Sequence, residues 1–216
     1  MTGESFSELA SRAAPPLDEL ALALAAEFRD VERGSALAEL DRFGAEVTAE
    51  IERLGRDEAE ALSGVLGGRH RFIGDRDEYD HPDNSMLDLV IERRKGLPIV
   101  LSVLYIEVGR RAGVPIVGVG LPGHYVVGNM VREPPLLLDP FAGGAALEIE
   151  APLEIRPWGP HETALRMLNN LTGSYLRRAD LARGIRAAEM RLDLPLSDSD
   201  AAALGAELRS LQARLN

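Results

Sequence analysis

Apolar residues change along the chain from helical spacing to unbroken runs and back, and this change divides the sequence into three regions. In residues 1–68 they recur every three or four positions, as in "LDELALALAAEFRD" and "SALAELDRFGAEVTAEIERLG". This spacing is typical of amphipathic helices. We expect the second helix to begin at Ser35 and end near Gly55, since serine is a common N-cap and glycine a common C-cap. A third, short helix is expected in "RDEAEALSGVLGG", so residues 1–68 are predicted to be helical.

The middle region, residues 69–157, begins with a loop and a helix in "HPDNSMLDLVIERRKG". Ser85 and Asp88 have the spacing of a capping box, and Gly96 suits the end of that helix. Proline is favoured in the first turn of a helix, so a second helix is expected from Pro98 to the glycine at position 113.

This second helix, which opens with "GLPIVLSVLY", is apolar on every side. A helix of that kind belongs in the interior of a protein. We therefore expect Leu101, Leu104 and Ile106 to be buried, and the helix to be central to the fold.

Three short strands are expected next, in "PIVGVGL", "GHYVVGNM" and "PLLLDP", because β-branched and aliphatic residues there are bounded by glycine and proline. Residues 158–216 return to helical spacing and predict three further helices. A central helix followed by antiparallel strands indicates an α+β fold.

Composition and charge argue against several classes of function. The 216 residues contain no cysteine, which excludes disulfides, thiolate metal sites and thiol nucleophiles. The net charge of −11 disfavours binding to nucleic acid or anionic membranes. No apolar run is long enough to span a membrane, and the first residues lack a signal-peptide pattern, so we expect a cytoplasmic protein.

Candidate chemistry lies at the start of the central helix and at two strand ends. His124 begins the second predicted strand and Asp139 ends the third, so the two side chains meet if these strands are antiparallel neighbours. A carboxylate beside an imidazole is half of a catalytic triad, and Ser102 would supply the hydroxyl. The alternative is structural: a strand histidine, a turn-capping aspartate and a small serine that allows close packing.

Several separated motifs resemble the SirB-type branch of the transglutaminase-like superfamily. They are the run from Asn84-Ser85 through Arg93, Gly96-Leu97-Pro98 and Ser102 to Tyr105, then Pro122-Gly123-His124-Tyr125, then Asp139-Pro140-Phe141. The resemblance implies a papain-like core in which active members carry a cysteine at the start of the central helix. His124 and Asp139 match the other two catalytic residues.

This chain departs from that pattern at the nucleophile. Counting back from Gly113, the cysteine position falls on Pro98, and Ser102 lies one helical turn deeper. We therefore expect Ser102 to be buried, with its hydroxyl bonded to the carbonyl four residues back.

Two other segments carry weaker signals. The acid-rich loop "GDRDEYDHPDNS" has oxygen ligands for a hard cation but lacks the spacing of a calcium loop, so we expect no metal and a solvated loop. Residues 158–216 resemble one tetratricopeptide-like unit, too short for a solenoid. Trp158 is expected to pack between the core and this tail.

The leading interpretation is a non-catalytic transglutaminase-like module with three parts: residues 1–68, a core at 69–157 and a tail at 158–216. It would bind a protein or small-molecule ligand in the cleft around Pro98, His124 and Asp139, with no cofactor, metal, nucleic acid or membrane. One alternative is a hydrolase or acyl transferase that uses Ser102. The other is an interaction scaffold that acts through the helical tail.

Overall fold

The computed structural model describes residues 3–55, 57–148 and 155–215. The α-helices are α1 Phe6–Ala10, α2 Leu17–Ala26, α3 Arg33–Leu54, α4 Glu58–Ser63, α5 Leu87–Arg93, α6 Pro98–Ala112, α7 Pro160–Arg177, α8 Leu181–Met190 and α9 Asp198–Gln212. The strands are β1 Ile73–Gly74, β2 Lys95–Gly96, β3 Val117–Leu121, β4 His124–Asn129, β5 Leu136–Asp139, β6 Ala145–Leu147 and β7 Pro157–Trp158. A π-helical turn at Gly64–Arg69 continues α4.

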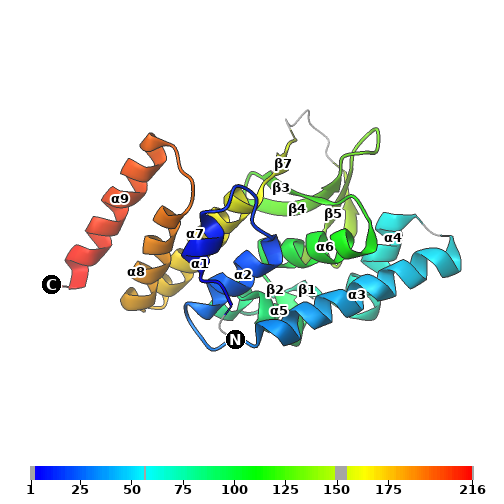
Figure 1. Cartoon of the computed structure of the whole chain (residues 1–216), viewed down its shortest axis with the longest axis horizontal. Coiled ribbons are helices and arrows are strands. Elements are labelled where there is room, and N and C mark those ends of the chain that lie inside the picture. The colour runs from blue at the N-terminus through cyan, green and yellow to red at the C-terminus, as the bar shows by residue number, and fades with distance from the viewer. Residues whose placement is uncertain (1–2, 56, 149–154, 216) are drawn as a thin grey trace.

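The central helix α6 lies between a sheet and the other helices of the core (Figure 1). The sheet has the order β6-β5-β4-β3-β7, and every neighbouring pair is antiparallel. On the other side of α6 run α3 and α5, while α8 and α9 extend the molecule away from the sheet (Figure 1). The predicted α+β fold, a central helix on an antiparallel sheet, is confirmed.

Alternation along the strands gives the sheet two different faces. Tyr125 and Val127 of β4, with Leu138 of β5, join the main core around α6. Val126 and Leu137 point the other way and form a smaller cluster. Because successive side chains of a strand alternate between faces, His124 shares its face with Val126, and Asp139 shares its face with Leu137.

The central helix begins and ends where the sequence predicts. Pro98 occupies its first turn, and Gly113 ends it in the left-handed conformation (φ 73°), which glycine adopts without strain. Leu101 and Leu104 are fully buried. Ile106 is only half-buried, since it packs against the edge of the core, and the expectation for this residue was wrong.

Three predicted helix boundaries were also wrong. Helix α3 begins at Arg33, ahead of Ser35, although it ends at Gly55 as expected. Helix α5 begins after Met86, so Ser85 and Asp88 form no capping box, and Ser85 belongs to a 3-10 turn instead. This helix ends at Arg93, with Arg94 as its C-cap, and so stops before Gly96.

Gly96 belongs to β2, which pairs in parallel with β1. The first carbon of a side chain at Gly96 would lie 2.6 Å from Val90 of α5. Contacts of this kind are longer in proteins, so glycine lets α5 and β2 approach closely, just before α6 begins.

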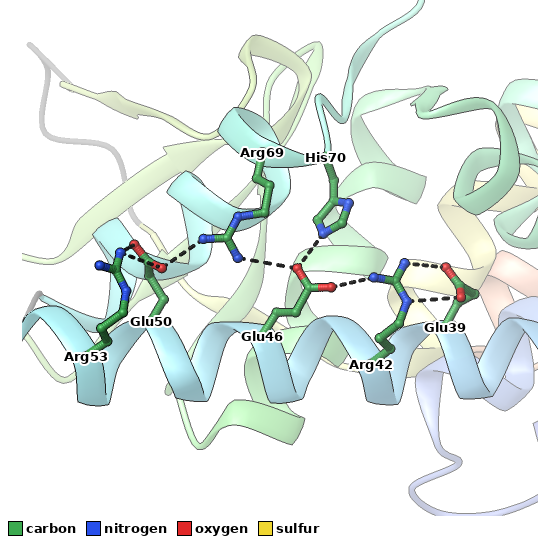
Figure 2. Close-up of polar contacts among 7 residues, drawn as sticks. All are labelled: Glu39, Arg42, Glu46, Glu50, Arg53, Arg69 and His70. Carbon is green, nitrogen blue, oxygen red and sulfur yellow. Dashed lines mark hydrogen bonds and ion pairs between the residues drawn. The ribbon is translucent and has the colours of Figure 1, made fainter.

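The long helix α3 carries a row of ion pairs along its surface (Figure 2). Arg42 pairs with Glu39 and Glu46, and Arg69 of the π-helical turn bridges Glu46 and Glu50. His70 Nε2 lies 2.7 Å from the same Glu46 carboxylate. These contacts hold the π-helical turn against α3. Each exposed ion pair of this kind contributes little to the free energy of unfolding.

The tail has the three predicted helices. Leu208 and Leu211 of α9 pack inward on Ile185 of α8 and form a small core of their own. In the part of the chain that the structure describes, no helix has the length and apolar character needed to cross a membrane.

Candidate functional site

The start of α6 is held by backbone hydrogen bonds rather than by side-chain charges. The Leu97 amide donates to the Asn84 carbonyl at 3.0 Å, and the Asp75 amide donates to the Gly96 carbonyl at 3.2 Å. Asn84 is fully buried, and its side-chain amide donates to the Glu78 carbonyl at 2.7 Å. These hydrogen bonds hold the segment just before Pro98, and Pro98 itself is buried. Pro98 is the position at which the resemblance places the cysteine of active members.

Ser102 lies one turn further along α6 and has no exposed surface. Its hydroxyl donates to the Pro98 carbonyl at 2.8 Å, as expected, and lies 3.5 Å from the carbonyl of Tyr125. The second contact brings the first turn of α6 beside the start of β4. It reaches the backbone next to His124, and no hydrogen bond joins Ser102 to the His124 ring among the described residues.

His124 and Asp139 lie together, as their places on neighbouring antiparallel strands predict. His124 Nε2 is 3.0 Å from Asp139 Oδ2, and both side chains are partly exposed. Asp139 Oδ1 also accepts a hydrogen bond from the Phe141 amide at 2.9 Å, which fixes the carboxylate at the end of β5. The imidazole is therefore oriented by a carboxylate that is itself held in place, an arrangement suited to proton transfer or to hydrogen bonding with a ligand.

Alternation along β4 directs neighbouring side chains to different faces of the sheet. The α6 side of β4 is occupied by Tyr125 and Val127, whereas His124 shares its face with Val126. A period of two along a strand turns adjacent side chains in opposite directions. Ser102 therefore meets the backbone of β4 next to His124, and its hydroxyl lies near the carbonyls of Pro98 and Tyr125.

Aromatic side chains surround the exposed edge of the pair. The ring of Phe141 lies 6.4 Å from the His124 ring and 5.8 Å from the ring of Tyr79, both edge to face. Tyr79 is 45% exposed. The guanidinium of Arg76 stacks over Phe141 at 5.4 Å. An exposed surface with aromatic rings and one cation therefore adjoins the histidine.

Two buried hydroxyls, those of Tyr105 and Ser63, lie near Gly144, which follows the Asp139 strand end. The sequence pattern does not identify them as candidates. The first carbon of a side chain at Gly144 would lie 2.8 Å from both the Tyr105 hydroxyl and Ser63 Oγ, so both groups face the same glycine. Burial, and then the negative charge of Asp139, raise the pKa of Tyr105 well above its usual value. In the sequence Tyr105 is only a large side chain in an apolar run, and only the folded structure brings its hydroxyl near the charge of Asp139.

The acid-rich loop is exposed at residues 76–80, as expected, but two of its carboxylates are held by arginine side chains. Asp75 is 3% exposed and pairs with Arg93 at 3.2 Å, while Asp80 pairs with Arg177 of α7 at 2.5 Å. Burial alone would raise the pKa of Asp75, but hydrogen bonds from Glu78 and Asn84 and nearby cations outweigh it, and the pKa is lowered. Across residues 3–55, 57–148 and 155–215, no three histidine or carboxylate side chains gather closely enough to hold a metal ion.

Comparison with known proteins places the chain in a family. Residues 34–156 match the family model described as the transglutaminase-like superfamily. The chain belongs to the transglutaminase-like superfamily, and the match begins within α3, well before the central helix.

Curated relatives extend the comparison. The chain is 38% identical over 153 residues to a UPF0162 protein of Xylella fastidiosa (strain 9a5c), covering 62% of this chain and 54% of that protein. It is 30% identical over 197 residues to a UPF0162 protein of Pseudomonas aeruginosa, covering 85% and 68%. A shorter match, 37% over 68 residues, joins it to F-box only protein 21 of Mus musculus, covering 32% and 11%.

The chain spans about half the length of the Xylella relative that it matches. No solved structure matches it.

Proposed function

We propose that this protein is a non-catalytic binding or regulatory module of the SirB-type branch of its superfamily. The observation that carries the proposal is the state of Ser102, which is fully buried and donates its hydroxyl to the Pro98 carbonyl. A serine nucleophile needs its oxygen within hydrogen-bond reach of a base and open to a substrate carbonyl. Ser102 meets neither requirement in this arrangement.

Pro98 supports the same proposal from the other side. A nucleophile at the start of a helix benefits from the free amides and partial positive charge there. Proline at that position offers no nucleophilic atom and is buried. His124 and Asp139 then form an oriented imidazole–carboxylate pair that has hydrogen-bonding capacity without a partner for acyl transfer.

The surface around His124 is the proposed binding site for a partner. It combines the partly exposed imidazole with the rings of Phe141 and Tyr79 and the cation of Arg76. Aromatic residues and arginine are enriched at protein interfaces. The proposal also keeps the division into residues 1–68, 69–157 and 158–216, with a cytoplasmic location away from nucleic acid and membranes.

The test is a comparison of proteins captured by immobilised variants. His124→Ala and Tyr79→Ala remove parts of the proposed surface, and Arg209→Gln on α9 is the matched control, since it changes an exposed side chain on the tail. At least one captured protein should be retained by the wild type and the control and lost from both surface variants. Equal capture by all four proteins would contradict a binding site at His124.

The competing hydrolase or acyl transferase would require Ser102 to leave its hydrogen bond to Pro98 and to reach His124 past the backbone of Tyr125. The scaffold alternative would require an open apolar face on the tail, yet Leu208 and Leu211 of α9 already pack against α8.

A further inference from the structure

A hollow of about 470 Å³ lies between β7 and α7, and its walls include none of the residues named for the surface at His124. The strand leads directly into the helix in this part of the fold (Figure 1). Its walls include Trp158 of β7 and Leu165, Arg166 and Asn170 of α7. Leu165 and Arg166 lie one turn before Asn169 and Asn170, so the α7 residues of the wall share one face of the helix. Its volume is in the range of sites that hold small molecules.

Arg166 is the side chain that gives the hollow its chemistry. Its guanidinium lies 5.7 Å from the ring of Trp158 and 5.6 Å from the ring of Tyr125. Its hydrogen bond to the Leu121 carbonyl is long, at 3.4 Å. Nowhere in the described ranges does Arg166 form an ion pair with a carboxylate, whereas Glu162, the acid in this wall, pairs with Arg156 at 2.5 Å.

An arginine without a carboxylate is notable in a chain of net charge −11. Glu162 and Arg156 neutralise each other, so Arg166 leaves the wall with a local positive charge. A guanidinium that stacks on an aromatic ring still has N–H donors along its edge. These donors can bind a carboxylate in a forked, bidentate geometry. Charge complementarity therefore favours an anionic ligand.

Trp158 and Leu165 supply the apolar part of the wall. Both are half-buried, so part of each side chain faces the hollow. Flat apolar groups pack well against an indole ring. The side-chain amide of Asn170, also half-buried, adds a donor and an acceptor at the same wall.

We propose that this hollow binds a small aromatic carboxylate. The aromatic ring of the ligand packs against Trp158 and Leu165, and its carboxylate binds the guanidinium of Arg166. The site is separate from the surface at His124 and does not depend on the proposed function of that surface.

Trp158 also provides the measurement, because it is the only tryptophan in the 216 residues. The probe is trans-cinnamate, titrated while Trp158 fluorescence is recorded, and the neutral analogue cinnamamide is titrated in parallel. Cinnamate should quench the fluorescence with saturation at millimolar concentrations or below. Cinnamamide should bind at least ~10-fold more weakly, since it lacks the charge that Arg166 recognises.

The variant Arg166→Gln should weaken cinnamate binding by at least ~10-fold and bring it to the level of cinnamamide. Arg209→Gln removes the same charge from the exposed surface of α9 and should leave binding unchanged. Circular dichroism checks that both variants are folded. The comparison of cinnamate with cinnamamide on the wild type stands even if Arg166→Gln unfolds.

Equal affinity for cinnamate and cinnamamide would overturn the proposal, as would unchanged cinnamate binding by folded Arg166→Gln. Absence of saturable quenching by cinnamate at millimolar concentrations would overturn it as well.

Discussion

The two ends of helix α6 are fixed by opposite means. At its end, Arg111 binds the buried carboxylates of Asp18 at 2.7 Å and Glu107 at 3.0 Å, and also the exposed Asp41 at 2.6 Å. At its start, the contacts are backbone hydrogen bonds and the hydroxyl of Ser102. The closed, charged end lies far along the helix from His124, and the start leaves an imidazole partly exposed.

We infer from this difference that the end of α6 contributes mainly to stability and its start mainly to recognition. Buried charges that satisfy one another hold a helix in one arrangement but offer nothing to a ligand. Partly exposed polar and aromatic groups at the other end remain available for binding. We therefore expect substitutions at the end of α6 to affect folding, and substitutions around His124 to affect binding.

The largest effect is expected from Arg111→Ala. The substitution removes the buried arginine that Asp18 and Glu107 share and leaves them only the more exposed Arg110, which also pairs with both. Breaking a buried ion pair in this way costs about 3–5 kcal/mol of unfolding free energy. Urea denaturation measures this loss.

The matched comparison is Arg110→Ala, which removes the other arginine that pairs with Asp18 and Glu107, one whose side chain is 59% exposed against 13% for Arg111. Its cost should stay within about 1 kcal/mol. Equal costs for the two variants would show that burial of the charges does not distinguish this end of the helix.

The middle of the helix is tested by Leu104→Ala. Leu104 is fully buried, so the variant should lose about 2–5 kcal/mol through lost transfer energy and a cavity. Ile106→Ala, on the same helix but half-buried, should lose clearly less in the same denaturation experiment. A loss below about 1 kcal/mol for Leu104→Ala would mean that α6 is not central.

Acidification should affect the two ends with opposite sign. The pKa of Asp75, beside the start of α6, is lowered in the fold, so its contribution to stability is present above its unfolded pKa and is lost as pH falls through the folded value. Burial and the charge of Asp18 raise the pKa of Glu107, so ionisation of Glu107 reduces stability as pH rises from the unfolded toward the folded value.

Denaturation of Asp75→Asn and Glu107→Gln across the acidic range measures this contrast. The wild type should lose stability relative to Asp75→Asn as the pH falls. It should lose stability relative to Glu107→Gln as the pH rises. The same pH dependence for both differences would contradict the assigned directions.

Part of this architecture could be predicted from the sequence. The all-apolar helix from Pro98 to Gly113 and the three strands β3, β4 and β5 have strong local patterns, and their order places His124 beside Asp139. Strands β6 and β7 are two or three residues long and have no alternation to reveal them. They are stabilised by pairing with β5 and β3, which local sequence does not encode.

The same limit applies to the candidate site. The hydrogen bond from Ser102 to Pro98 is local, four residues along a helix, and was predicted correctly. The buried network of Asn84 and the hydroxyl of Tyr105 near Gly144 depend on contacts between distant segments. Ser85 and Asp88 show the converse, since a local capping pattern was displaced by the turn that Asn84 organises.

The smallest effect on stability is expected from Ser102→Ala. The variant removes one buried hydroxyl, which donates a hydrogen bond to the Pro98 carbonyl. That carbonyl also takes part in the backbone hydrogen bonding of the helix. A loss of about 1 kcal/mol or less is expected from denaturation, with the fold retained. A much larger loss would give Ser102 a structural role beyond this single bond.

The proposal that the protein is non-catalytic is tested most directly by labelling Ser102. The wild-type protein is incubated with a fluorophosphonate probe, and intact-protein mass spectrometry records covalent addition, with Ser102→Ala treated in parallel. Because Ser102 is buried and its hydroxyl is bonded to Pro98, the account predicts no labelling of either protein. Stoichiometric labelling of the wild type at Ser102, abolished in Ser102→Ala, would contradict it and identify the protein as a serine-dependent enzyme.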